Sequence, residues 1–341
     1  MKIGFAGNIY GSPKGHSYVV RDMVNAVMDA GHEAHMFRIH NNPIPNEFTM
    51  PTTLTSHNGQ IIPKEDFEKW LDEKQLDWCI FMEYSQWWDE DHDKIQICKD
   101  RGVKTIGWLV YERLNWAKKD HYKLYTKIAC PTGFQTTLMR KHGIYNAVHT
   151  PWGVDFNELD NVQEPEHKKK TVFYHCAGSG GVGDRKNTNT VIEAYKQIEG
   201  PDTELRISHL NSRVFSREEI IAFTKYADVI LNPSKWDTIG LNTMEACACG
   251  RPVIVANTKP MTELIKDNVN GLLVNGTIGK CEHVTCPSYE VDVSELAKKM
   301  TYCKSKLILD TLKRNARKFA KKNFDWEINK EHLLKILDTE V

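Results

Sequence analysis

The sequence of 341 residues lacks the features that mark membrane-spanning, secreted and polyanion-binding proteins. No run approaches the ~20 apolar residues of a transmembrane helix, and the first residues predict a strand rather than a signal peptide. Lys and Arg together number 45, as do Asp and Glu, so no charge excess favours a polyanionic partner. The 9 cysteines are scattered and odd in number, which indicates reduced thiols. We therefore expect a cytoplasmic protein with no transmembrane segment.

What the sequence does contain is a regular alternation of apolar runs and helical patterns, in two series. Continuous β-branched runs are typical of buried parallel strands. The pattern predicts an α/β fold of two doubly wound, Rossmann-like domains facing a cleft, with a polar linker at 157–170. Strands are expected at 2–6, 34–39, 78–82, 103–110, 125–131, 171–176, 204–210, 228–231, 253–255 and 271–274. Helices are expected from the cap Ser17 to the stop Gly31, and at 94–101, 135–142, 187–198, 216–226, 240–249, 293–300 and 306–323.

The stretch 233–255 joins two of these strands through the short helix 240–249, with Thr238 or Asp237 as cap and Gly250 as stop. A helix N-terminus at the carboxyl edge of a parallel sheet attracts anions. Glu245 lies eight positions after Asp237, and a carboxylate on this helix can accept both hydroxyls of a ribose or a sugar. The stretch therefore predicts a site for phosphate and sugar together.

A glycine loop at 178–183 follows a strand, precedes a helix and satisfies the G-x-G-x-x-G pattern. A dehydrogenase would need an acid near residue 210, where the sequence has none; Arg213 would at best suit a 2′-phosphate. Arg185 and Lys186 follow the loop, as a pyrophosphate would require. A phosphate cradle is favoured, while an NAD(P)-dependent oxidoreductase and a purely structural tight turn remain as alternatives.

In their order and spacing these motifs resemble the donor domain of the family 4 retaining glycosyltransferases. The motifs are Lys186-Asn187, Pro233-Ser234, Asp237-x-x-Gly240-Leu241, Glu245-Ala246-Cys247-Ala248-Cys249-Gly250-x-Pro252-Val253-Ile254 and Asn270-Gly271-Leu272-Leu273-Val274. Outside that domain, Gly153-Val154-Asp155 resembles the family's domain-joining motif, and the early glycine-rich loop, its helix and Gly31-His32-Glu33 resemble the family's first βα unit. The resemblance implies the GT-B architecture, with an N-terminal domain at 1–155, a donor domain at 156–324 and a segment at 325–341 that crosses back. It implies a hexosyltransferase that takes a UDP- or GDP-linked sugar, needs no metal or other cofactor, and retains the anomeric configuration.

The resemblance also implies roles for individual residues on the donor side. Glu245 would bind the ribose and Lys186 the diphosphate, with Lys186 and Asp237 taking part in catalysis. Asp237 stands where the family has a glutamate that contacts donor sugar hydroxyls, so it is one methylene shorter. Arg185 is the nearest basic group to an arginine that the family has and this loop lacks. The remaining expected donor-binding residues are Gly180, Gly181, Ile239, Gly240, Leu241 and Asn242.

On the acceptor side, many relatives place a histidine after the fourth strand, where this sequence has Tyr111 and Glu112. Glu112 is the predicted catalytic residue there; the alternative is a solvated glutamate paired with Arg113. Gly11, Gly15 and His16 are expected to face the same cleft, although His16 also fits a plain loop histidine. The acceptor is open: a glycan, lipid, protein or modified nucleic acid all fit.

Three other groups have simpler explanations. The D-x-D pattern at 87–93 suits Mn²⁺ or Mg²⁺, but acids before a helix also suit its dipole. Cys281, His283 and Cys286 offer three soft ligands, too few for a closed zinc site. Four lysines and aromatic residues between 116 and 127 fit a solvated helix face better than a weak peripheral membrane contact. Asp237 and the missing histidine also leave open a relative that binds nucleotide sugars without catalysis.

Overall fold

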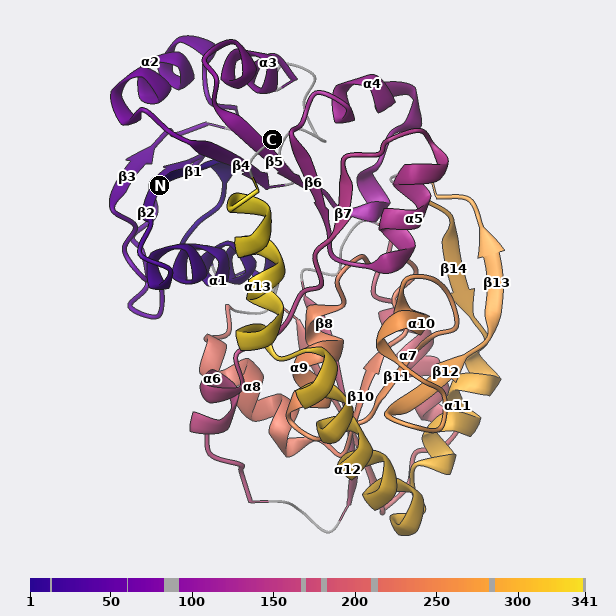
Figure 1. Cartoon of the computed structure of the whole chain (residues 1–341). Coiled ribbons are helices and arrows are strands. Elements are labelled where there is room, and N and C mark those ends of the chain that lie inside the picture. The colour runs from indigo at the N-terminus through magenta and orange to yellow at the C-terminus, as the bar shows by residue number, and fades with distance from the viewer. Residues whose placement is uncertain are drawn as a thin grey trace. The chain divides into compact units, whose positions relative to one another are not determined.

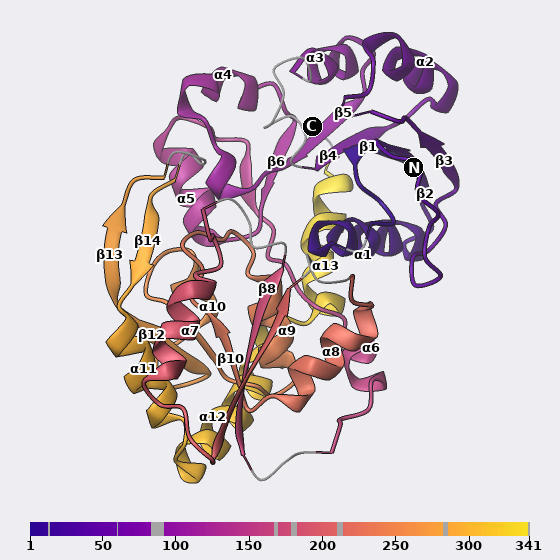
Figure 2. The ribbon, with the colours of Figure 1, turned by 180° about the vertical axis from the view of Figure 1, so that it is seen from behind.

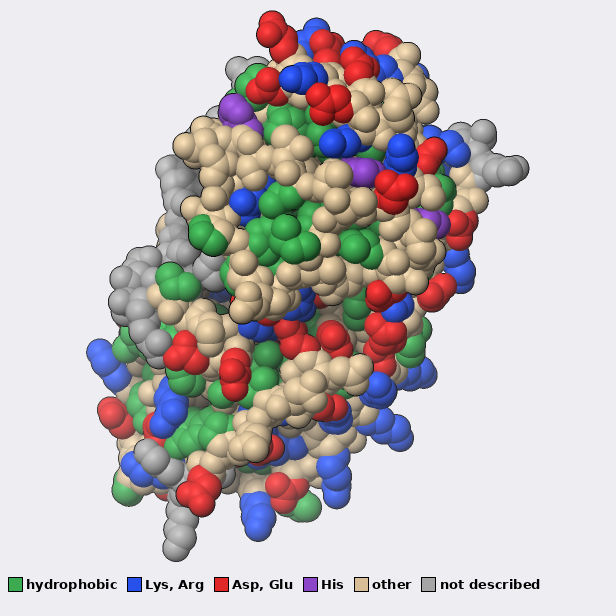
Figure 3. Space-filling model, turned by 90° about the vertical axis from the view of Figure 1, so that its left-hand side faces the viewer, with side chains coloured by type: hydrophobic (Ala, Val, Ile, Leu, Met, Phe, Trp, Pro, Cys, Tyr) green, Lys and Arg blue, Asp and Glu red, His purple; other side chains and the backbone are tan. Residues whose placement is uncertain are grey.

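The computed structural model describes residues 1–339 except 13, 60, 83–91, 167–169, 179–182, 210–213 and 282–285, and except the side chain of His92. It consists of two compact units, the first of Met1–Pro151 with Lys330–Val341 and the second of Trp152–Asn329 (Figure 1). The sequence had predicted the borders after residues 155 and 324. On the face drawn in Figure 3, acidic and basic side chains intermingle, in keeping with 45 of each sign.

The first unit is built on a seven-stranded parallel sheet in the order β3-β2-β1-β4-β5-β6-β7. Its order reverses between β1 and β4, which is the position where open α/β sheets bind ligands. Figures 1 and 2 show α1 on one face of the sheet and α2 with α3 on the other. The strands are β1 (Lys2–Asn8), β2 (Glu33–Arg38), β3 (Thr53–Ser56), β4 (Trp78–Met82), β5 (Lys104–Trp108), β6 (Lys127–Cys130) and β7 (Ala147–His149). The helices are α1 (Gly15–Asp29), α2 (Lys64–Lys74), α3 (His92–Asp100), α4 (Lys119–Tyr122) and α5 (Gly133–Lys141), with short 3₁₀ turns η3 (Tyr111–Arg113) and η4 (Trp116–Lys118).

The second unit contains a five-stranded parallel sheet in the order β12-β11-β10-β8-β9, which reverses between β8 and β10. Helix α11 packs with α7, and α9 packs with α8 and α12 (Figure 2). The strands are β8 (Thr171–Gly178), β9 (Thr203–His209), β10 (Val229–Asn232), β11 (Val253–Ala256) and β12 (Gly271–Val274), with an antiparallel pair β13 (Gly276–Gly279) and β14 (Ser288–Val291). The helices are α6 (Phe156–Asn161), α7 (Thr188–Lys196), α8 (Arg217–Tyr226), α9 (Leu241–Ala248), α10 (Met261–Leu264), α11 (Val293–Tyr302) and α12 (Lys306–Asn323). Helix α13 (Trp326–Leu337) begins in the second unit, and its residues from Lys330 onward belong to the first.

Buried strands explain why both sheets form. All five residues of β4 are buried, as are all four of β10 and of β11, so each strand has apolar contacts on both faces. The α/β prediction with two Rossmann-like domains is confirmed. Within the described residues, no helix combines the length and the apolar character needed to cross a bilayer.

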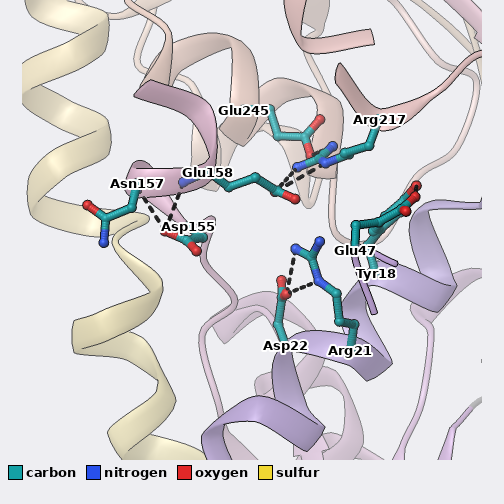
Figure 4. Close-up of polar contacts among 9 residues, drawn as sticks. All are labelled: Tyr18, Arg21, Asp22, Glu47, Asp155, Asn157, Glu158, Arg217 and Glu245. Carbon is teal, nitrogen blue, oxygen red and sulfur yellow. Dashed lines mark hydrogen bonds and ion pairs between the residues drawn. The ribbon is translucent and has the colours of Figure 1, made fainter. Parts of the chain in front are cut away.

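Three local predictions were wrong. Ser17 does not cap α1, because the helix begins at Gly15 and the Ser17 hydroxyl donates to the carbonyl of Ile9 at 3.0 Å. The predicted linker begins as helix α6, because the Asp155 carboxylate accepts from the N–H groups of Asn157 and Glu158 at 2.8 and 3.3 Å (Figure 4).

Helix α9 shows the third difference. Gly240 is its N-cap, in place of Thr238 or Asp237, and no side chain caps the helix there. Asp237 instead accepts a hydrogen bond from the Gly240 N–H at 3.3 Å, one residue before the helix begins.

Candidate functional site

The candidate site lies at the carboxyl edge of the second sheet, where the strand order reverses between β8 and β10. The loop that follows β8 is fastened to the loop that follows β10. The Lys235 N–H donates to the Arg185 carbonyl at 2.9 Å, and the Asn187 amide donates to the Pro233 carbonyl at 2.9 Å. These bonds hold the basic pair Arg185 and Lys186 beside the stretch that begins at Pro233.

A buried histidine, which the sequence did not single out, also aligns these elements. His175 in β8 contacts the carbonyl of Leu231 in β10 at 2.8 Å and the hydroxyl of Thr188 in α7 at 3.0 Å. Burial lowers the pKa of His175 to about 4, so the ring is neutral at physiological pH. It therefore serves to position the two loops rather than to supply charge.

Lys186 and Asp237 form an ion pair at the centre of the site. The Lys186 Nζ lies 2.9 Å from the Asp237 Oδ2, and the side chains are 14% and 15% exposed. Arg185 lies 3.8 Å from the same oxygen and donates to the Trp236 carbonyl. Burial by itself would raise the pKa of Asp237, but Lys186, Arg185 and the Gly240 N–H outweigh it and lower the pKa to about 2. Asp237 is therefore ionised at neutral pH.

The N-terminus of α9 lies next to this pair, because the Gly240 N–H donates to Asp237. Gly240 has a φ of +60°, and a Cβ at this position would lie 2.8 Å from Leu264 Cδ1, so only glycine fits. Asn242, in the first turn, has a buried Oδ1 with no hydrogen-bond partner among the described residues. An uncapped helix N-terminus next to two cations is suited to an anion.

Glu245 lies further along α9 and is buried against Arg217 (Figure 4). The Arg217 guanidinium also donates to Glu158 Oε2 at 2.9 and 3.2 Å, so it joins two carboxylates. Burial lowers the pKa of Arg217, but Glu245 and Glu158 together outweigh it and raise the pKa. Sequence reasoning missed Arg217 and Glu158. The available signal was the capping box Ser216-x-x-Glu219, which makes Arg217 the first residue of α8.

The acceptor-side candidates all belong to the first unit. Gly11 lies in the loop after β1, Gly15 begins α1, and His16 follows in its first turn. Tyr111 and Glu112 form the turn η3 after β5. The Tyr111 ring packs edge-on against Phe134 with centroids 5.0 Å apart. Since the strands are parallel, the carboxyl ends of β1 and β5 lie at the same edge of this sheet.

Some predicted site residues lie outside the described residues. They are Gly180, Gly181, Arg213, His283 and the part of the D-x-D stretch at 87–91. Across the described residues, no group of three or more His, Cys, Asp or Glu side chains could hold a metal ion. Ile239 and Leu241 flank Gly240 at the start of α9.

Comparison with known proteins identifies the stretch that contains α8, β10 and α9. Residues 212–278 match the family profile described as Glycosyl transferases group 1. Over these residues the chain is similar to the group 1 glycosyl transferases. This matched segment includes Arg217, Asp237 and Glu245, and thus most of the second unit's candidate site.

Similar proteins match the chain over part of its length. A GDP-mannose-dependent alpha-(1-6)-phosphatidylinositol dimannoside mannosyltransferase of Mycobacterium tuberculosis is 27% identical over 169 residues, which are 41% of this chain and 43% of that protein. A D-inositol 3-phosphate glycosyltransferase of Mycolicibacterium smegmatis is 34% identical over 84 residues, 22% of this chain and 19% of its own. The matched region therefore spans less than half the length of these relatives.

Solved structures match over nearly the whole chain at low identity. Sucrose-phosphate synthase from Thermosynechococcus elongatus has a TM-score of 0.74 at 15% identity, covering 98% of both chains. HepE of Anabaena, solved in complex with UDP and glucose, has a TM-score of 0.75 at 14% identity, covering 99% of both. These likenesses show the fold, which is the two-domain GT-B architecture.

Proposed function

We propose that the chain is a retaining glycosyltransferase that needs no metal ion and moves a hexose from a UDP- or GDP-linked donor to an acceptor bound by the first unit. The main support is what converges at the carboxyl edge of the second sheet. There Asp237, the N-terminus of α9 and the buried Glu245 lie on one strand–loop–helix stretch, and Lys186 pairs with Asp237 from the loop after β8. In a nucleotide sugar the diphosphate joins the hexose to the ribose, so Asp237, the N-terminus of α9 with Lys186, and Glu245 would contact the hexose, the diphosphate and the ribose in that order.

The diphosphate would lie at the N-terminus of α9, with Lys186 and Arg185 beside it. As the bond to the sugar breaks, negative charge develops on the leaving diphosphate, and fixed cations and amides stabilise it. Preorganised donors of this kind each lower a barrier by about 3 kcal/mol. Because these groups supply positive charge at the leaving oxygen, the proposed reaction requires no divalent cation.

Glu245 would accept hydrogen bonds from the ribose hydroxyls. It pairs with Arg217, and a carboxylate in such a pair acts as an acceptor only. Asp237, released from Lys186 when the diphosphate arrives, would be available to a hydroxyl of the donor sugar. The shorter aspartate places this contact nearer the backbone than a glutamate would.

The similar proteins indicate which nucleotide sugars should be tested as donors. The mycobacterial relative is named as GDP-mannose-dependent, and the Anabaena neighbour was solved with UDP. Purified protein should therefore be incubated with UDP- and GDP-linked hexoses, with nucleotide release and thermal shift as measurements. We expect one base to stabilise the fold, and turnover to persist in EDTA. Stabilisation by NADPH and by no nucleotide sugar would contradict the proposal, and donor binding without turnover or hydrolysis would leave a binding protein.

Glu112 is the proposed acceptor-side residue. Glu112→Gln should leave the donor affinity unchanged and slow the transfer step, because the residue lies on the first unit and would act on the acceptor or the reacting centre. Donor titration and single-turnover rates separate the two effects. Transfer at the wild-type rate would show that Glu112 has no part in the reaction.

A further inference from the structure

The buried arginines of the described residues differ in one respect. Arg21 pairs with Asp22 at 2.8 Å (Figure 4), and Arg251 pairs with Glu164. Arg217, whose side chain is 13% exposed, joins two carboxylates. Arg38 is as buried as Arg21, with both residues 5% exposed. Among the described residues, however, no carboxylate pairs with Arg38. A buried cation without a counter-ion is costly, so proteins seldom keep one without a ligand for it.

Arg38 lies at the carboxyl edge of the first sheet, beside the point where the strand order reverses. It is the last residue of β2, and the register pairs it with Asn8 of β1 and with Ser56 of β3. Its Nε donates to the Ser56 hydroxyl at 2.8 Å, and one terminal nitrogen donates to the Tyr10 carbonyl at 3.1 Å. These neutral partners orient the guanidinium, but among the described residues they provide no negative charge to balance it.

The loop that follows β1 adds a second feature that suits an anion. Gly11 has a φ of +86°, and a Cβ there would lie 3.3 Å from the same nitrogen of Arg38, so the backbone and the guanidinium are in close contact. The loop leads directly into α1, a helix of 15 residues whose N-cap, Lys14, makes no side-chain cap. Its first turn contains no acid. The helix N-terminus and the buried cation thus flank one short loop.

We infer that the Arg38 site, made of Arg38, Ser56 and the Tyr10–Gly11 backbone in the loop before α1, binds a phosphate group carried by the acceptor. That the phosphate belongs to the acceptor rests on the proposed function, whereas phosphate binding at Arg38 does not. A planar guanidinium presents several N–H donors in a fixed fork, which matches the oxygens of a phosphate. Because Arg38 is almost fully enclosed, a phosphate that reaches it loses most of its water and interacts strongly.

A structural role for Arg38, holding two loops together, is the competing explanation, and direct binding measurements separate the two. Inorganic phosphate and glucose 6-phosphate are titrated by calorimetry, with glucose as the uncharged control ligand. All chains carry Lys186→Ala, so that phosphate bound at the second unit does not obscure the signal. The chains compared are otherwise wild-type, R38M, R38K and R101M. Arg101 is a matched control, because it is an arginine of the first unit that pairs with Asp72 near the surface.

We expect the otherwise wild-type chain and R101M to bind both phosphates equally. R38M should bind them about tenfold more weakly or worse, and R38K should lie in between, because it keeps the charge and loses the fork. Equal affinity in R38M, or no phosphate binding by the otherwise wild-type chain, overturns the inference. If R38M fails to fold, the Nε–H NMR signal of Arg38 in the wild-type chain, assigned with R38K, must shift on addition of glucose 6-phosphate; an unchanged signal overturns it equally.

The source of the phosphate is tested separately. Co-sedimentation with phosphatidylcholine vesicles, with and without phosphatidic acid, is compared between the wild-type chain and R38M. Arg38-dependent binding to the phosphatidic acid vesicles assigns a lipid-borne phosphate, and its absence together with glucose 6-phosphate binding assigns a soluble one. A UDP and GDP titration of the wild-type chain reports on the proposed function independently, so failure of either idea leaves the other measurable.

Discussion

The second unit neutralises a partly buried carboxylate, Asp237, and a buried one, Glu245, in different ways. Asp237 lies against the single ammonium of Lys186, with Arg185 further away at 3.8 Å. Glu245 lies against Arg217, whose planar fork binds a second carboxylate, Glu158, at the same time. Lysine is a compact charge on a flexible stem, whereas a guanidinium bonded on two sides is fixed in orientation.

This difference divides the proposed donor site into two parts: the Lys186–Asp237 pair, which can exchange ionic partners, and the Arg217–Glu245 pair, which cannot. Lys186 can turn from Asp237 to an incoming diphosphate, because either anion satisfies one ammonium. Arg217 cannot leave Glu245 without also disturbing Glu158 on α6. We therefore expect changes at Arg217 to act mainly on stability, and changes at Lys186 to act mainly on donor affinity.

Removing Arg217 should have the largest effect. Arg217→Met leaves Glu245 buried, beside the partly buried Glu158, without their shared cation. Breaking a buried ion pair in this way costs about 3–5 kcal/mol. Urea unfolding measures the loss. Lys304→Met is the control, since it breaks an exposed pair with Asp202, whose side chains are 30% and 59% exposed, and such pairs contribute little to stability. Similar losses in both variants would show that Arg217 is an ordinary surface partner.

Removing Lys186 should have the next largest effect, on donor binding. Lys186→Ala should weaken donor affinity by about 2 kcal/mol, the cost of a lost charged hydrogen bond. Its stability should fall less than that of Arg217→Met, because Arg185 remains beside Asp237. Isothermal titration with the donor that the panel identifies gives the affinity, and urea unfolding gives the stability.

Glu245→Ala provides the comparison on the other carboxylate. It should weaken donor affinity by a similar amount, about 2 kcal/mol. Unchanged affinity in both Lys186→Ala and Glu245→Ala would rule out the donor site proposed for the second unit.

Regular elements were predictable because their signals are local. Helix α12 has the predicted bounds 306–323, since its buried residues recur at helical spacing. Gly31 and Gly250 follow their helices with φ of +78° and +70°, as stop signals require. The strands were found from continuous apolar runs.

The contacts that define the site were not predictable in the same way. Arg217 and Glu245 are 28 positions apart, and Arg217 and Glu158 are 59 apart, so only the packing of α8 between α6 and α9 brings them together. No motif marks such a pair. The helix at the start of the linker was hidden for another reason: Phe156 and Leu159 supply a buried face, but the polar residues around them dominate the composition. The polar strand β3 was missed likewise, because its four residues lack an apolar run.

The smallest expected effect is the pH dependence that the Lys186–Asp237 pair gives to stability. The pKa of Asp237 falls from 3.8 to about 2 on folding, so the folded state favours the ionised form. A lowered carboxylate pKa contributes stability above the unfolded value, and this contribution is lost as the pH falls from about 4 to about 2. Because the side chain is 15% exposed, we expect no more than about 2 kcal/mol. Urea unfolding of the wild-type chain and Asp237→Asn between pH 7 and pH 2 measures it, and the difference between them should shrink only below about pH 4. Parallel curves over the whole range would mean that Lys186 does not hold Asp237 in its ionised state, and the exchange of partners at this pair would lose its basis.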